Sequence, residues 1–194
     1  AGDKVSDAVD PKTGLPVYSL YGKTRKPTPE MLKDIDVMVY DIQDNGCRSF
    51  TFISTLGLLM EAAAENGKEV IVLDRPNPLG GNKVEGSIVE AGCFSFVSQF
   101  EIPYMYGLTV GELAQMLNSE GMLKGEKGDR DSLVQCKLTV VPMEGWNRNM
   151  VFTDTKLPWV LPSPHMPQAE TSYYYPATGI LGEFGYVSIG VGYT

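Results

Sequence analysis

Cysteine and histidine are scarce in this sequence. Its 194 residues include three cysteines and one histidine. Cys47, Cys93 and Cys136 form no C-x-x-C pair, and only His165 could join them. Closely spaced Cys and His residues are the usual ligands of structural zinc, and dense cysteines staple small secreted domains. The sequence therefore predicts neither a disulfide framework nor a metal site.

A concentration of positive charge is also missing. The formal net charge is −8, and the 16 Lys and Arg residues are scattered along the chain. A basic patch is the usual electrostatic footprint of a protein that binds nucleic acid or an anionic membrane surface. We therefore expect no nucleic-acid partner, and instead a ligand that is neutral or recognised by local hydrogen bonds.

Long hydrophobic runs do not occur. No stretch of 18 apolar residues is present, and the start "AGDKVSDAVD" lacks the basic and apolar blocks of a signal peptide. We expect no membrane span in this chain. The hydrophobic content of 43% is nevertheless enough for a sizeable core. The polar start and the Gly-rich end "GYVSIGVGYT" are typical of a fragment, so we expect further sequence on both sides.

Cofactor motifs are absent as well. The sequence has no G-x-x-x-x-G-K-[ST], no G-x-G-x-x-G opening a helix, no H-E-x-x-H and no G-x-S-x-G. We expect no cofactor.

Trp146, Trp159 and the tyrosines at 173–175 could stack on sugar faces or simply pack the interior. Carboxylates, amides and aromatics without a cofactor motif favour a carbohydrate site over a nucleotide site.

Helix and strand patterns alternate in the first 142 residues. Strands are predicted at 17–21, 37–40, 69–73 and 137–141, and helices at 28–33, 52–66 and 109–120. A strand, a helix and a strand within about 35 residues make a βαβ unit. The continuous apolar strand runs favour a parallel sheet covered on both faces. The predicted fold class is therefore α/β, with a layered core and a mostly parallel sheet.

The composition changes after Pro142. Pro, aromatic and Gly residues crowd 146–194 with little periodicity. We therefore predict an α/β domain at 1–142, with its N-terminal part missing, and the start of a second domain at 143–194. In such sheets, ligands bind in the crevice at the carboxyl ends of the strands.

Two acids follow the first long strand run, in "VMVYDIQDNGCR". Asp41 and Asp44 could hold a sugar hydroxyl, orient a water or act in acid/base chemistry. Alternatively, Asp44 builds an Asx turn with Asn45, and Asp41 pairs with Arg48. The pattern leaves both interpretations open.

A second polar cluster ends the next strand, in "VIVLDRPNPLGG". Asp74 and Arg75 could form an internal ion pair while two prolines fix the loop. A rigid backbone around Asn77 suits an amide held toward a ligand, because preorganised groups lose less entropy on binding. A brace for the loop is the alternative interpretation.

Four further residues are candidates. Glu112 forms a T-x-x-E capping box with Thr109, which favours a structural role. Glu85 has no such explanation, although exposed loop glutamates are common. In "LPSPHMP", three prolines stiffen the loop that carries Ser163 and His165. A lone histidine is more often a surface or packed residue than a catalyst.

Seven ordered blocks resemble one protein family. They are "SLYGKTRKPTPEML", "DIQDNGCRSFTF", "LDRPNPLGG", "VEGS", "YGLTVGELA", "GWNRNM" and "WVLPSPHMP", within residues 17–175. The chain resembles the exo-β-N-acetylmuramidase (NamZ-like) family of glycoside hydrolases, formerly a domain of unknown function. The resemblance implies a Rossmann-like domain, a smaller second domain and a cleft between them. It also implies a cell-envelope enzyme that removes β-1,4-linked N-acetylmuramic acid from the non-reducing end of peptidoglycan fragments during cell-wall recycling.

The resemblance also implies site residues. As catalytic residues it implicates Asp41, Asp74 and Glu85. As substrate-binding residues it implicates Asp44, Arg48, Arg75, Asn77, Glu112, Ser163 and His165. Muramic acid carries a lactyl carboxylate, which suits Arg48 or Arg75 because a guanidinium binds a carboxylate with two bonds. Which carboxylate serves as acid, base or nucleophile stays open.

Some positions depart from the family pattern. The family's Pro-Glu-His-Gly segment is expected upstream of Ala1, and its glutamate is a candidate acid or base, so we expect residues 1–194 alone to be inactive. Residues 104–107 replace a basic-His-Gly segment, His165 replaces an Asn, and the tail "SIGVGYT" replaces "SEGRGT". These changes keep two alternatives open: a relative acting on another amino sugar, and a glycan-binding domain without catalysis. A nucleotide-binding α/β domain is disfavoured by the missing glycine fingerprints.

Overall fold

A parallel three-stranded sheet forms the centre of the molecule. The structure, a computed structural model, describes residues 6–125 and 134–183. The strands are β3 (Val37–Tyr40), β4 (Glu69–Leu73) and β5 (Lys137–Val141), in the order β3-β4-β5. Their bounds are those predicted from the sequence. Together with the helices packed on the sheet, they confirm the predicted α/β class.

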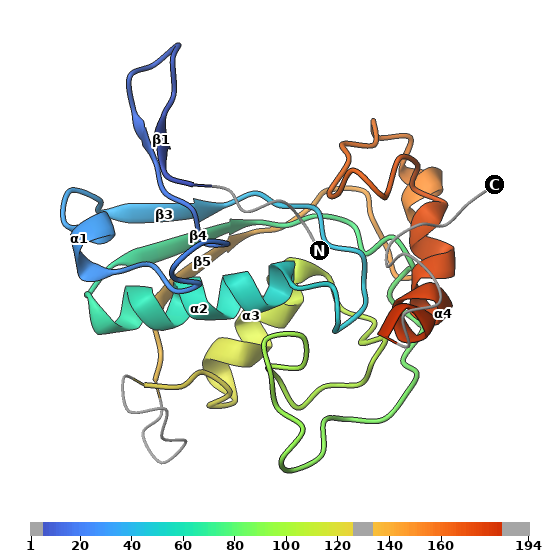
Figure 1. Ribbon diagram of the computed structural model, residues 1–194. Helices are drawn as coiled ribbons and strands as arrows, with labels where there is room; N and C mark the ends of the chain where they lie inside the picture. Colours follow the sequence, from blue (N-terminus) through green and yellow to red (C-terminus); the bar gives the residue numbers. More distant parts are fainter. Residues whose placement is uncertain (1–5, 126–133, 184–194) are drawn as a thin grey trace.

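Two helices cover one face of this sheet. They are α2 (Phe52–Glu65) and α3 (Val110–Ser119), which lie below the strands in Figure 1. Apolar residues recur on one side of each helix and meet the inward-facing residues of the strands. Fully buried members of this core include Ile53, Leu56, Met60, Val70, Val72, Leu113 and Leu117. Each such burial contributes about 1.5–3 kcal/mol relative to an exposed side chain.

The opposite face of the sheet is open within the described residues. Val39 is 59% exposed and Val141 is 47% exposed, and alternate residues of β3 and β5 share this exposure. The prediction of a sheet covered on both faces is therefore not met by this part of the chain. Apolar strand runs indicate where cover is needed, but they carry no information about which segment provides it.

The helix ends follow the predicted signals. The Thr109 side chain accepts from the Glu112 backbone N–H, and the Glu112 carboxylate accepts from the Thr109 N–H. The short helix α1 (Pro29–Leu32) begins after Thr28, whose hydroxyl caps it. Helix α2 is followed by Gly67 at φ +63°, in the left-handed region that glycine adopts without strain. The expected capping box is confirmed, and Gly67 is the left-handed stop that a glycine after a helical pattern predicts.

The predicted strand at 17–21 is wrong in extent. The structure has a two-stranded antiparallel hairpin, β1 (Ala8–Val9) and β2 (Pro16–Val17), which projects beyond the sheet (Figure 1). Asp10 organises its turn by accepting from the Thr13 N–H at 3.0 Å. The pairing partner of β2 therefore lies before it in the chain, and the residues after Val17 leave the hairpin.

The region beyond β5 contains two helices that were not predicted from its sequence. These are a 3-10 helix, η1 (Phe152–Thr155), and α4 (Thr171–Glu183), which includes Pro176. Tyr175 of α4 packs edge-on against Phe50, with ring centroids 5.5 Å apart, so tertiary contacts stabilise a helix that its own proline disfavours.

The predicted domain boundary at 142/143 stays a prediction. The charged segment "GEKGDRD" at 125–131 also predicts a polar turn; its residues 126–131 and the tail at 184–194 lie outside the described residues. No described helix has the length and apolar character needed to cross a bilayer.

Gly57 lies inside α2 against the buried ring of Phe100, where an added Cβ would collide with the ring. Replacing a helical glycine with alanine normally gains up to about 1 kcal/mol. We expect Gly57→Ala to lower the free energy of unfolding instead, because overpacking costs roughly 1–3 kcal/mol. Denaturant unfolding of the full-length protein measures this. In a Phe100→Leu background the same change should become neutral or stabilising, and a stabilising effect with Phe100 in place would contradict the packing argument.

Candidate functional site

An ion pair joins the carboxyl ends of β3 and β4. Arg75 Nε donates to Asp41 Oδ1 at 2.7 Å, and Arg75 Nη2 lies 2.6 Å from the same oxygen. The Arg75 and Asp41 side chains are 33% and 48% exposed. The two side-chain pairings that the sequence left open as alternatives, Asp41 with Arg48 and Asp74 with Arg75, are therefore not formed. The pair faces solvent at the edge where the sequence predicts a ligand.

The Asp74 carboxylate is hydrogen-bonded to the start of α3. Its Oδ1 accepts from the N–H groups of Gly111 at 2.7 Å and Arg75 at 3.0 Å, and its Oδ2 accepts from the Thr109 hydroxyl at 2.8 Å. Burial raises the pKa of Asp74, while the hydrogen bonds from Gly111 and Thr109 oppose the rise. A carboxylate is stabilised at the positive end of a helix dipole. Asp74 thus ties the end of β4 to α3, which is why it does not pair with the Arg75 guanidinium.

Asn77 braces the loop after β4. Its Nδ2 donates to the Leu108 carbonyl at 2.9 Å, and its Oδ1 accepts from the Leu79 N–H at 3.0 Å. Gly46 lies against this amide with φ +86°, and a Cβ at that position would overlap Asn77. Asn77 is 4% exposed. These contacts match the loop-brace interpretation of Asn77, and any contact with substrate stays a prediction.

Asp44 is a buried acid. Its Oδ2 accepts from the Gly46 N–H at 2.8 Å, which is the expected Asx turn, and from the Tyr106 hydroxyl. Its Oδ1 is buried without a hydrogen-bond partner in the described part of the chain. Burial raises the pKa of Asp44 to about 6, with partial compensation from Tyr106 and Gly46. Asp44 therefore lies behind the strand edge and not on its surface.

Arg48 and Glu85 belong to loops that run side by side. Arg48 Nη1 donates to the carbonyls of Ser87, at 2.8 Å, and Ile102. Burial lowers the pKa of Arg48. Glu85 exchanges two backbone hydrogen bonds with Met105, at 2.9 and 3.0 Å, and its side chain is exposed. The guanidinium thus holds the loops together, while the Glu85 carboxylate faces solvent.

Ser163 and His165 lie on the loop between η1 and α4. His165 is exposed, and its N–H donates to the Ser163 hydroxyl at 3.4 Å. Within residues 6–125 and 134–183, no hydrogen bond or ion pair joins either side chain to the strand-end residues. Their predicted part in substrate binding stays a prediction.

Arg148 is a central residue that the sequence analysis did not single out. Its Nη2 lies 2.6 Å from Glu112 Oε1, and its Nη1 donates to the carbonyls of Gly81 at 2.9 Å and Gly107 at 3.0 Å. The Arg148 carbonyl accepts from the Gly81 N–H at 2.9 Å. Its signal is the arginine of "GWNRNM", one of the family blocks. The predicted site residue Glu112 therefore has two structural tasks, the α3 cap and this clamp.

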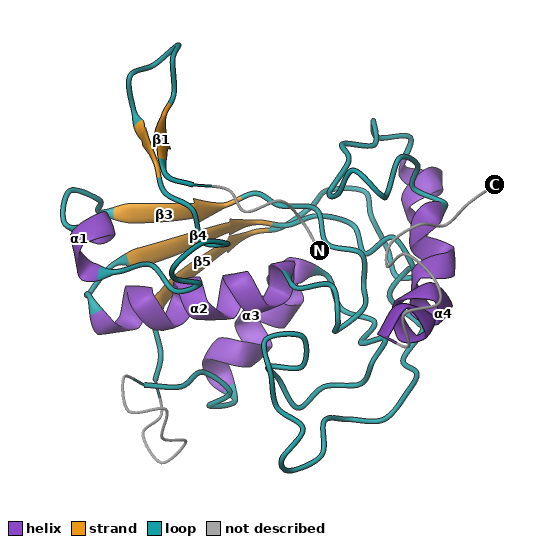
Figure 2. Cartoon of the chain, viewed as in Figure 1, coloured by secondary structure: helices purple, strands orange, loops and turns teal. Residues whose placement is uncertain are grey.

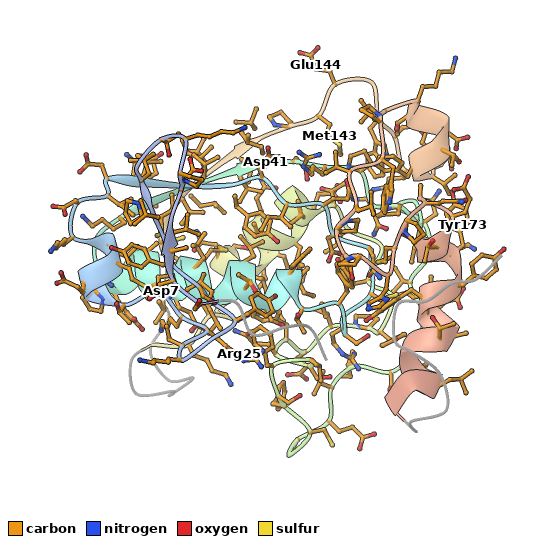
Figure 3. All side chains as sticks on the ribbon, turned by 45° about the horizontal axis from the view of Figure 1, so that its top comes forward. Asp7, Arg25, Asp41, Met143, Glu144 and Tyr173 are labelled. Atoms are coloured by element: carbon orange, nitrogen blue, oxygen red, sulfur yellow. The ribbon has the colours of Figure 1, made fainter. Side chains whose placement is uncertain are left out.

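A hollow of about 360 Å³ opens at the loop that follows Arg75. It lies between Pro76, the residue after Arg75, and the segment that leaves β5. Figure 3 shows Met143 and Glu144 of that segment on the same side of the molecule as Asp41. Among the described residues, no three His, Cys, Asp or Glu side chains are placed to hold a metal ion. An exposed ion pair next to a mainly apolar hollow suits a hydroxylated ligand that also has an apolar face.

Sequence comparison relates the chain to proteins of one family. The family described as "Exo-beta-N-acetylmuramidase NamZ, N-terminal" matches residues 1–170. The peptidoglycan beta-N-acetylmuramidase NamZ of Bacillus subtilis (strain 168) is 52% identical over 181 residues, which are 93% of this chain and 41% of that protein. The chain thus spans less than half the length of this relative.

Structure comparison agrees. A crystal structure of a DUF1343 family protein from Bacteroides fragilis NCTC 9343 is 66% identical, with a TM-score of 0.87, over 96% of this chain and 46% of its own. A second DUF1343 family protein of the same organism is 34% identical, with a TM-score of 0.77, over 90% of this chain and 44% of its own. Both relationships extend over at least 90% of this chain.

The buried Asp44 makes stability depend on pH. Its pKa is about 6 in the folded protein, against an ordinary aspartate value of 3.8, so the folded state binds more protons than the unfolded state between these values. Stability should therefore fall as pH rises from about 4 to 6, by an amount on the order of 3 kcal/mol from this group. We expect Asp44→Asn to flatten this part of a plot of Tm against pH in the full-length protein. The exposed Glu90 provides a control: Glu90→Gln should leave the slope unchanged, and an unchanged slope in Asp44→Asn would refute the assignment.

Proposed function

The chain belongs to the exo-β-N-acetylmuramidase NamZ family, and from this membership we propose that the whole protein is a glycosidase that acts on peptidoglycan fragments. The proposed reaction removes β-1,4-linked N-acetylmuramic acid from the non-reducing end, in the cell envelope, during cell-wall recycling. The observation that carries the proposal is the 52% identity to a peptidoglycan beta-N-acetylmuramidase across 93% of the chain.

The Asp41–Arg75 pair supports a site for the lactyl carboxylate of muramic acid. Arg75 uses Nε and Nη2 toward Asp41. A guanidinium carries five N–H donors, so Nη1 is available to an incoming carboxylate while Asp41 holds the side chain in place. Arg48 is the weaker choice, because its Nη1 already donates to two carbonyls.

The three proposed catalytic acids differ in what they can reach. Asp41 and Glu85 are exposed, so their carboxylates can approach a sugar. Both oxygens of Asp74 accept hydrogen bonds from the chain itself, so its part is to fix the geometry of the strand edge. Glycoside hydrolysis needs a proton donor at the leaving oxygen and a second group that attacks the sugar or activates water. Within this chain, Asp41 and Glu85 are the candidates for one of these roles, and the glutamate expected upstream of Ala1 is the candidate for the other.

The remaining site residues divide in the same way. Asp44, Arg48, Asn77 and Glu112 bond to neighbouring loops, so we propose that they position the site. Ser163 and His165 lie on an accessible loop and are proposed to contact the substrate directly.

The alternatives can be separated by two assays on the full-length protein. Release of free amino sugar from a chromogenic β-N-acetylmuramide distinguishes a glycosidase from a glycan-binding domain. A parallel β-N-acetylglucosaminide tests for a relative that acts on another amino sugar. Thermal-shift measurements with nucleotides against muropeptides test the nucleotide-binding alternative, which predicts stabilisation by the former only.

Arg75→Ala tests the carboxylate site. Charge-assisted hydrogen bonds contribute about 1.5–3 kcal/mol, so we expect KM for the β-N-acetylmuramide to rise roughly tenfold to a hundredfold. KM for a β-N-acetylglucosaminide, which lacks the lactyl group, should change much less. Arg75→Lys keeps the positive charge but lacks the planar guanidinium, so its KM for the muramide should lie between those of the wild type and Arg75→Ala. Lys33→Ala, at an exposed ion pair with Glu30 at the C-terminal end of α1, is the control. Wild-type KM for the muramide in Arg75→Ala would remove Arg75 from this role.

A further inference from the structure

We propose that the hollow beside Arg75 binds the N-acetyl group of the substrate's amino sugar, with Trp146 as its central wall. This inference rests on the proposed function and deepens it by assigning a part of the substrate to one place. The hollow has a volume of about 360 Å³, and its walls include Pro76, Met143, Glu144, Trp146, Met150 and Leu157.

The position of the hollow places it next to the proposed carboxylate site. Pro76 follows Arg75 directly, and Met143 lies two residues after the end of β5. The hollow therefore opens at the carboxyl ends of two adjacent parallel strands, where open α/β sheets bind ligands. N-acetylmuramic acid carries its lactyl group and its acetamido group on neighbouring ring carbons. One sugar can therefore reach Arg75 and the hollow at the same time.

The chemistry of the walls suits an acetamido group and the apolar face of a pyranose. Two methionines, a leucine and a proline line the hollow together with Trp146. Small-ligand sites combine mainly apolar walls with a few polar groups that set orientation, and here Glu144 and Thr155 supply those groups. The methyl of an acetamido group fills apolar space, while its N–H can donate to a carboxylate such as that of Glu144.

Trp146 adds an independent observation. Its indole N–H is buried and has no acceptor among the residues that the structure describes. Buried donors are nearly always paired, and Trp146 lines the hollow, so a small shift of the indole would pair this N–H with an acceptor that arrives with a ligand. The acetamido carbonyl is such an acceptor. Trp159, the other tryptophan, is different, because its N–H donates to the Met166 carbonyl at 2.9 Å.

The charge around the hollow favours a neutral group over an anion. The one ionisable side chain among its lining residues is the acid Glu144, and the chain carries a net charge of −8. A phosphate or second carboxylate would be repelled there. The anionic part of the sugar is thus directed to Arg75, and its uncharged acetamido group to the hollow.

The walls are held in a fixed position. Arg148 lies between Trp146 and Met150, and it clamps this segment to Gly81, Gly107 and Glu112. The same segment is joined to the loop after β4 by a hydrogen bond from the Phe152 N–H to the Pro78 carbonyl, at 3.2 Å. Preorganised walls reduce the entropy lost when a ligand binds. Arg148 is therefore a positioning residue for this subsite.

The test compares N-acetylated sugars with their free-amine forms on the full-length protein. Calorimetry would measure Kd for N-acetylmuramic acid against muramic acid, and for methyl β-N-acetylglucosaminide against methyl β-glucosaminide. The variants are Trp146→Ala and Trp146→Phe, with Trp159→Phe as the matched control. Saturation-transfer NMR would report which ligand protons lie closest to the protein.

We expect the wild type to prefer both N-acetylated sugars and to transfer saturation most strongly to the acetamido methyl. Trp146→Ala should weaken their binding at least tenfold and remove the preference, whereas Trp159→Phe should change neither. Trp146→Phe keeps an aromatic wall without the N–H and should retain part of the affinity, which guards against a folding defect in the alanine variant.

Two results would overturn the inference: no preference of the wild type for N-acetylated sugars, or an unchanged preference in both Trp146 variants. These results are distinguishable from failure of the proposed function. Cleavage of the muramide with a Trp146-independent preference would refute the subsite alone. Trp146-dependent binding without any cleavage would refute the glycosidase and leave the subsite in place.

Discussion

The bond network of the Asp74 carboxylate is the constraint on which the strand edge depends. It joins the end of β4 to the first turn of α3 through Gly111 and Thr109. The contact is tight, because a Cβ at Gly111 would overlap both the Asp74 carboxylate and Val140 of β5. The start of α3 is thereby fixed against two strands. Glu112, which lies in that same turn, is then placed to hold Arg148.

Further side-chain contacts hold the loops around the hollow in place. Arg148 contacts Glu112 of α3 and therefore fixes the segment between β5 and η1, which contains Trp146 and Met150, relative to that helix. Close contact between Asn77 and Gly46 packs the loop after β4 against the loop after β3, and Asn77 also bonds to Leu108. The exposed Asp41–Arg75 pair joins the residues that directly follow β3 and β4. Figure 2 shows how much of this half of the molecule consists of loops, which makes such side-chain braces necessary.

The sequence predicted the central elements well because their signals are local. The apolar runs of β3, β4 and β5, the Thr109–Glu112 capping box and Gly67 each act within a few residues. Helix α4 was missed because it depends on packing between Tyr175 and Phe50, which are 125 positions apart. The pairing of Arg75 failed for a related reason. Its sequence neighbour Asp74 is taken up by α3, a helix that begins 36 residues later.

The candidate site was predictable in place but not in roles. Parallel topology brings the ends of "VMVY" and "VIVL" to one edge, so a cluster of polar residues there follows from the strand assignment alone. Roles depend on which groups remain accessible after the braces form. A buried carboxylate such as Asp44 responds to desolvation with a raised pKa, whereas Asp41 and Glu85 stay in contact with water. The division between residues that can touch a sugar and residues that hold the site therefore comes from tertiary burial, which no local motif encodes.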